Sequence, residues 1–158
     1  MTSVARPAPR RLDAFALASE PGNERLAIAR VASALASAGL PPARLERLKT
    51  AVAEATMNAI EHGNGNRAEI PVDVEVTQDG DAITVSITDH GGGAPVVPGG
   101  EPDLAKKLDG TQSPRGWGLF LIRKMVDALS IETDGRRHTI RLTMRTPAPG
   151  GARHDEQM

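Results

Sequence analysis

Three stretches of the chain repeat apolar residues at steps of three and four positions, which is the spacing of one face of an α-helix. The strongest repeat runs from Pro42 to His62. An earlier one lies between Asn23, which can cap a helix, and Gly39, which can end one. The predicted stripes are Leu26, Ala29, Ala32 or Ser33, and Leu35 or Ala36 in the first helix; Leu45, Leu48, Val52, Ala55 and Ala59 in the second; and Leu119, Ile122, Met125 or Val126, and Leu129 in the third.

Other stretches alternate apolar and polar residues, as strands with one buried face do. Turn sequences at 78–81 and at Asp134-Gly135 join four of these strands into two hairpins, and the earliest strand is expected at a sheet edge. We therefore predict an α+β fold, a two-layer sandwich in which helices cover one face of a mostly antiparallel sheet. The predicted strands are Arg11 to Ala18, Ile70 to Val76, Ile83 to Ile87, Ser130 to Thr133 and His138 to Met144.

The composition predicts a single domain. The chain has 158 residues, of which 39% are hydrophobic and 25% charged, and these values suit one globular unit with flexible ends. We place the domain at residues 11–146. Residues 1–10 and 147–158 are rich in proline, alanine, glycine and charge, so we predict disordered tails.

Charge and cysteine content exclude several classes of partner and site. The formal net charge of -1 provides no electrostatic reason to bind nucleic acid or an anionic membrane directly. No stretch approaches the roughly 20 apolar residues of a membrane-spanning helix. Without cysteine, neither a disulfide nor a thiolate metal site can form, and we expect a cytoplasmic location.

We predict a long loop over about residues 91–116, between the first predicted hairpin and the third helix. Glycines stand at both ends of the loop, several prolines lie within it, and Asp103 to Leu108 is a short possible helix. Loops of this length inside a compact domain commonly serve as lids or binding loops. We expect a lid with glycine hinges.

Three segments carry the candidate chemistry, and the first lies on the second helix. Glu54, Asn58 and His62 recur every four residues, so their side chains should stack on one face. Asn58 offers a neutral oxygen that suits Mg²⁺ shared with phosphate groups. Glu54, one turn earlier, is the candidate base for a hydroxyl that attacks phosphorus.

The other two segments suit an adenine ring and a phosphate chain. Asp89 ends a buried strand, where its carboxylate needs donors such as the exocyclic amine of adenine. The backbone N–H groups of Gly116-Trp117-Gly118, at a helix start, suit phosphate oxygens, and Arg115 adds a charged donor. Taken singly, the three segments also fit a solvated helix face, a strand-ending turn and an ordinary helix entry. Their order along the chain favours an ATP site.

These segments resemble the sequence boxes of the GHKL ATPase superfamily and, more narrowly, those of stand-alone bacterial anti-sigma-factor serine/threonine kinases. The boxes are Glu54-Ala-x-x-Asn58-Ala-x-x-His62, Asp89-x-Gly91-x-Gly93 and Gly116-x-Gly118-Leu-x-Leu-Ile. The resemblance covers about Leu12 to Arg145 and implies the Bergerat ATP-binding fold. It implies Glu54 as the general base, Asn58 as the Mg²⁺ ligand and Asp89 as the adenine reader. The implied nucleotide-binding residues are Asn58, Asp89, Gly91, Gly93, Arg115, Gly116, Trp117, Gly118 and Leu119.

The resemblance also implies partners. It suggests a homodimer that uses ATP and Mg²⁺, sequesters a sigma factor and phosphorylates a serine of a small anti-sigma-factor antagonist. A second hypothesis is an ATP-binding regulatory protein that binds its partner without phosphorylating it. The catalytic part of a sensor histidine kinase is disfavoured, because no histidine precedes His62 to accept the phosphate.

Overall fold

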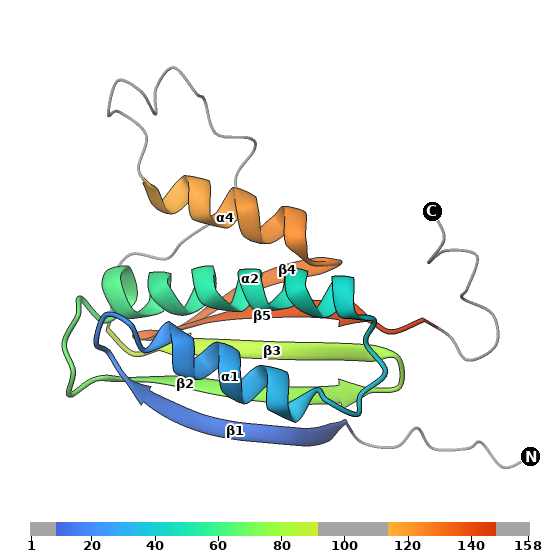
Figure 1. Ribbon diagram of the computed structural model, residues 1–158. Helices are drawn as coiled ribbons and strands as arrows, with labels where there is room; N and C mark the ends of the chain where they lie inside the picture. Colours follow the sequence, from blue (N-terminus) through green and yellow to red (C-terminus); the bar gives the residue numbers. More distant parts are fainter. Residues whose placement is uncertain (1–8, 92–113, 148–158) are drawn as a thin grey trace, which may run out of the picture.

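The computed structural model describes residues 9–91 and 114–147, with backbone only for residues 114–117. Helices cover one face of a five-stranded sheet (Figure 1). A π-helical turn, η1, continues the second helix. In chain order the elements are β1 (Arg10–Ala18), α1 (Glu24–Ala34), α2 (Pro42–Asn58), η1 (Ala59–Gly63), β2 (Pro71–Asp79), β3 (Ala82–Asp89), α4 (Pro114–Met125), β4 (Ala128–Asp134) and β5 (Arg137–Arg145).

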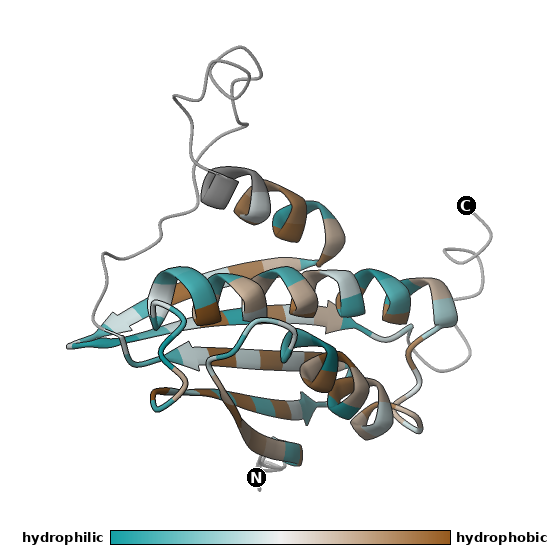
Figure 2. Cartoon of the chain, turned by 60° about the vertical axis from the view of Figure 1, so that its left-hand side comes forward, coloured by the Kyte–Doolittle hydropathy of each residue, from teal (hydrophilic) through white to brown (hydrophobic). Residues whose placement is uncertain are grey.

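The sheet has the strand order β1-β2-β3-β5-β4, and every neighbouring pair is antiparallel. β1 therefore lies at an edge, as predicted. Apolar and polar residues alternate along the strands (Figure 2). Val72, Val74 and Val76 are buried under the helices, while Asp73 and Glu75 alternate with them and are partly exposed. The predicted α+β, two-layer sandwich is confirmed.

The buried face of α1 differs from the predicted one. Ala27, Val31 and Leu35 are buried, whereas Leu26 is 54% exposed. The predicted stripe is therefore wrong at Leu26 and Ala29, which are both exposed, and right at Leu35. Asn23 precedes the helix as expected, but its side chain does not cap it; its amide donates instead to the carbonyl of Ala18 at 2.8 Å.

The second helical stretch covers its predicted range but changes type within it, and the third helix ends earlier than its sequence pattern predicts. α2 keeps the predicted core stripe, with Leu48, Val52 and Ala55 buried, and then widens into η1. α4 ends at Met125, so Leu129 belongs to β4 and not to the helix. In the described part of the chain, no helix is long and apolar enough to cross a membrane.

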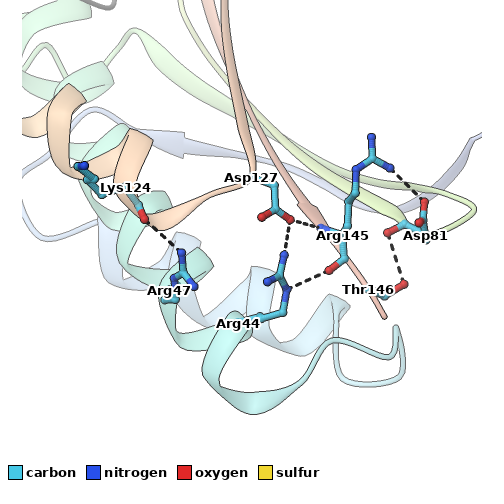
Figure 3. A network of polar contacts seen from close by, with 7 residues as sticks. All are labelled: Arg44, Arg47, Asp81, Lys124, Asp127, Arg145 and Thr146. Atoms are coloured by element: carbon cyan, nitrogen blue, oxygen red, sulfur yellow. Dashed lines mark hydrogen bonds and ion pairs between the residues drawn. The ribbon is translucent and has the colours of Figure 1, made fainter. Parts of the chain in front are cut away.

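Two arginines near the start of α2 fasten it to α4 and β5 (Figure 3). Arg44 donates to the carbonyl of Arg145 at 3.0 Å and to the Asp127 carboxylate, which also accepts the backbone N–H of Arg145 at 2.8 Å. One turn further along α2, Arg47 donates to the carbonyl of Lys124, in the last turn of α4, at 3.2 Å. The C-terminal end of α4 is therefore held against α2.

The pKa of Asp127 predicts how this network responds to acid. Partial burial raises that pKa, but the Arg145 N–H and the Arg44 guanidinium lower it more, so the net shift is downward. Since the unfolded chain binds this proton more tightly, the stabilisation is present above about pH 4 and is lost as pH falls through the lowered folded value. We expect Asp127→Asn to lower the free energy of unfolding by about 1 kcal/mol at neutral pH and much less at about pH 3, as measured by urea titration.

Asp134 provides the matched control because it is exposed at the end of β4, directly before the turn to β5. Asp134→Asn should change the free energy of unfolding equally little at both pH values. An equal loss for Asp127→Asn at neutral and acidic pH would contradict an ionic contribution from Asp127.

Candidate functional site

A small cavity of about 40 Å³ lies between the sheet and the helices α2 and α4. Four residues with polar side chains line it, from three elements: Asn58 at the end of α2, Asp89 at the end of β3, and His138 and Thr139 near the start of β5. The hydroxyl of Thr139 pairs with that of Thr88 at 2.8 Å. The apolar part of the wall consists of Ala55, Ala59, Ile87, Leu119, Ile131 and Ile140. An apolar cavity with a few convergent polar groups is typical of a small-molecule site.

Asp89 and His138 face each other in the sheet. They are cross-strand partners in the pairing of β3 with β5, and His138 Nδ1 lies 3.0 Å from Asp89 Oδ1. Each side chain is only 10% exposed, so the histidine supplies a donor that the buried carboxylate needs. Sequence reasoning missed His138, because 49 residues separate it from Asp89 and only the strand register brings them together.

Two glycines let the backbone pass close to Asp89. A Cβ atom at Gly63 would lie 2.3 Å from the Asp89 carboxylate, and one at Gly91 would lie 1.7 Å from the carbonyl oxygen of Gly63. Neither position has room for a side chain. Gly63 ends η1, and π-helical turns occur frequently at functional sites. The sequence pattern identified Gly91 but not Gly63.

Asn64, directly after η1, connects the segments around this close approach. Its side-chain amide donates to Ser19 Oγ at 2.9 Å and to the carbonyl of Pro71 at 3.0 Å. Its Oδ1 accepts the backbone N–H of His90 at 2.9 Å. Because Asn64 is fully buried and bonded on both sides of its amide, it holds the chain that follows Asp89 against the ends of β1 and β2.

The polar side chains of α2 meet α4 at Gly118. A Cβ atom at Gly118 would lie 3.1 Å from Glu54 Oε2 and 3.2 Å from Asn58 Nδ2, so the bare glycine lets α4 lie directly beside both. Asn58 Nδ2 is buried and, among the described residues, has no hydrogen-bond acceptor. An unpaired buried donor is costly, and a ligand oxygen would satisfy it.

The remaining predicted site residues divide into three groups. Leu119 is buried and lines the cavity. The backbone of Arg115, Gly116 and Trp117 lies in the first turn of α4, and their side chains lie outside the described part, as does all of Gly93. His62 is exposed and is not part of the cavity wall, because η1 widens the helix after Asn58.

The sequence pattern suggested that the glycine pair Gly116 and Gly118 precedes the third helix, and the structure differs. The helix begins at Pro114, so Gly116 and Gly118 lie within its first turns. Proline is favoured at the first position of a helix, because that residue needs no backbone N–H. The helix dipole still has its positive end at this side of the cavity.

The described residues fit Mg²⁺ only in combination with a phosphate ligand. No group of three or more His, Cys, Asp or Glu side chains that could hold a metal ion occurs within residues 9–91 and 118–147. Asn58 supplies a single amide beside Glu54, and Mg²⁺ commonly takes one or two protein oxygens with phosphate and water as its other ligands. The roles of individual residues toward ATP and Mg²⁺ stay predictions.

Known proteins resemble this chain over most of its length. The family model of the histidine kinase-like ATPase domain matches residues 17–144. An anti-sigma F factor of Clostridium botulinum (strain Eklund 17B / Type B) is 34% identical over 116 residues, which cover 72% of this chain and 80% of that protein. An anti-sigma F factor of Clostridium beijerinckii is 34% identical over 115 residues, covering 71% and 79%.

A solved structure has the same fold. The structure of the RsbU and RsbW domains of Rv1364c from Mycobacterium tuberculosis matches with a TM-score of 0.62 and 20% identity. The match covers 88% of this chain but only 32% of that longer one. At this level of identity, the similarity supports the arrangement of sheet and helices alone.

Proposed function

Because this chain belongs to the family of histidine kinase-like ATPase domains, we propose that it is an ATP-dependent anti-sigma factor that is also a serine kinase. It binds a sigma factor, and it transfers the γ-phosphate of ATP to a serine of a small antagonist protein. Membership of the family confirms the resemblance drawn from the three sequence boxes. The sigma factor as partner is supported by the relatives named anti-sigma F factor.

The contact of Gly118 with Glu54 and Asn58 is the observation that carries the kinase proposal. It brings the start of α4, where backbone N–H groups and the helix dipole favour phosphate, beside one carboxylate and one amide. Asp89 lines the cavity that Asn58 also lines, and its carboxylate suits the amine of adenine. A nucleotide bound by both groups would have its phosphates next to Glu54.

Each polar residue then has one task in the transfer. Glu54 accepts the proton of the serine hydroxyl as that oxygen attacks the γ-phosphorus, provided the serine reaches hydrogen-bonding distance. Asn58 ligates Mg²⁺, which neutralises phosphate charge when bound. The buried NH₂ of the same amide donates to a phosphate or water oxygen. Leu119, Ala55 of α2 and Ala59 of η1 exclude water from the adenine side.

Asn58→Ala should remove the benefit of Mg²⁺ for nucleotide binding. We expect the ATP affinity of the variant to be nearly the same with Mg²⁺ as with excess EDTA, because the amide oxygen is lost. The wild-type protein should bind ATP at least about tenfold more tightly with Mg²⁺, a difference of about 1.4 kcal/mol. Calorimetric titration with and without Mg²⁺ measures both values, and a variant that keeps the full Mg²⁺ effect would exclude Asn58 as a ligand.

The proposed kinase activity is tested with the purified protein, γ-labelled Mg-ATP and a lysate of its own host. A small labelled protein whose phosphate survives acid is expected, because phosphoserine is acid-stable. Acid-labile label would indicate phosphohistidine and contradict the proposal. No label, despite measured ATP binding, would favour the alternative of a regulatory protein that binds ATP without transferring phosphate.

The anti-sigma activity needs a separate test, since binding does not require phosphate transfer. Sigma factors of the host are expressed singly and mixed with the protein in the presence of ATP or without nucleotide. One of them should co-elute with it in size-exclusion chromatography only when ATP is present, and the mass of the complex shows whether the protein is the proposed homodimer. Failure of every host sigma factor to bind would contradict this part of the proposal.

A further inference from the structure

We propose that His138 is a positioning residue that makes the nucleotide site select a purine with an amino group at position 6 over one with an oxygen there. It does so by holding the Asp89 carboxylate in place, with one oxygen left to accept a hydrogen bond from the base. The inference rests on the proposed function, because it concerns the base of the nucleotide that this function requires. None of the three sequence boxes contains His138.

The contact between the two side chains leaves one carboxylate oxygen for a ligand. His138 Nδ1 lies 3.0 Å from Asp89 Oδ1, and a proton on Nδ1 lets the ring donate to that oxygen. Oδ2 lies next to the backbone of Gly63, where a Cβ atom would be only 2.3 Å away, so the carboxylate fits there only because Gly63 has no side chain. None of the described residues donates a hydrogen bond to Oδ2. Both side chains face the cavity, with 10% of each exposed.

Among the described residues, His138 is the side chain of the cavity wall that contacts this carboxylate. The other two polar side chains of the wall lie against different groups: the Thr139 hydroxyl pairs with that of Thr88 at 2.8 Å, and the neutral amide of Asn58 lies beside Gly118. Ala55 of α2 and Ala59 of η1 are apolar. From α4 and β4, as far as they are described, the wall has the apolar side chains of Leu119 and Ile131. No second charged side chain of the described residues lines the cavity. The orientation of the Asp89 carboxylate therefore depends on its contact with His138.

The orientation of the Asp89 carboxylate determines which purine it accepts. A carboxylate has only acceptor oxygens, so it binds an amino group and repels a carbonyl oxygen. Without the contact to His138, the carboxylate can turn away from the base, and no acceptor oxygen is then held opposite position 6. Loss of His138 should therefore weaken ATP binding and, as a separate effect, reduce the preference for ATP over inosine triphosphate.

Calorimetric titration of the full chain with ATP and with inosine triphosphate tests the proposal, because these ligands differ in the base only at position 6 and its adjacent proton. For His138→Leu we expect an ATP affinity about tenfold lower and an ATP-to-inosine triphosphate ratio about tenfold smaller than in the wild-type protein. His138→Asn should keep the ratio within about threefold, since its amide nitrogen can donate from a position close to that of Nδ1.

His90→Leu is the matched control. His90 also contacts a carboxylate, with its Nε2 2.5 Å from Asp73 Oδ2, but this pair lies at the surface and not at the cavity. It should change neither affinity nor ratio. If His138→Leu fails to fold, as judged by circular dichroism, the ratio of His138→Gln takes its place, because the longer side chain moves the donor away from Asp89.

Two results would overturn the inference, and they are distinguishable. A folded His138→Leu variant with the wild-type ratio would show that Asp89 needs no help from His138, while ATP binding by the wild-type protein would leave the proposed function intact. A wild-type protein that binds neither nucleotide would refute the proposed function and, with it, this inference.

Discussion

Replacing Glu54 with alanine is expected to abolish phosphate transfer and to leave ATP binding intact. A general base contributes about 10²- to 10⁴-fold to a proton-transfer step, so labelling of the antagonist should fall at least about 100-fold. The dissociation constant of ATP should stay within about threefold of the wild-type value, or improve, since a carboxylate next to phosphate groups repels them. Initial rates of label transfer and calorimetric titration measure the two quantities on the same preparation.

Glu46→Ala is the matched control for this experiment. Glu46 lies on the same helix, two turns earlier, and its exposed carboxylate pairs with Lys49 at 3.0 Å. Its loss should affect neither quantity, since an exposed pair contributes little. Equal transfer rates for Glu54→Ala and the wild-type protein would exclude Glu54 as the base. A loss of ATP binding in Glu54→Ala would show instead that the carboxylate maintains the site.

Local periodicity predicted most of the fold, and its failure in α1 has a physical reason. The α2 stripe and the alternating strands bury large side chains at fixed intervals, so only one orientation hides them from water. α1 is rich in alanine, and several of its faces are similarly apolar. Packing against α2 and β1 therefore decides the orientation, and Leu26 is exposed while the smaller Ala27 is buried.

The sequence predicted the site residues that lie within its three motifs. It did not predict the residue that only the pairing of β3 with β5 brings to the site. The sequence placed Asn58, Asp89 and Leu119 in one site, and all three line the cavity. It gave no signal for His138, because a histidine in an alternating strand is unremarkable until the strand pairs with β3. The widened turn after Asn58, which turns His62 away, likewise follows from packing and not from helix propensity.

Gly91→Ala is expected to abolish measurable ATP binding. The added Cβ would lie 1.7 Å from the carbonyl oxygen of Gly63 and 2.9 Å from the Cα of Asn64. Both are backbone atoms, so no side-chain rotation relieves the clash, and the segment after Asp89 must move. Overpacking of this kind costs about 1–3 kcal/mol. Displacement of Asp89 by even about 1 Å also misplaces its contact with adenine.

Gly80→Ala separates this steric effect from the general cost of replacing a glycine. Gly80 has a φ of 63° in the turn between β2 and β3, and a Cβ atom there would meet nothing within 4 Å. Its replacement should cost about 1 kcal/mol through backbone strain alone and leave ATP binding unchanged. Calorimetry and urea titration of both variants measure affinity and stability. If Gly91→Ala binds ATP like Gly80→Ala, the close approach of Gly91 and Gly63 is not needed for the nucleotide site. If it loses binding while remaining folded, the space left by the missing side chain is part of that site.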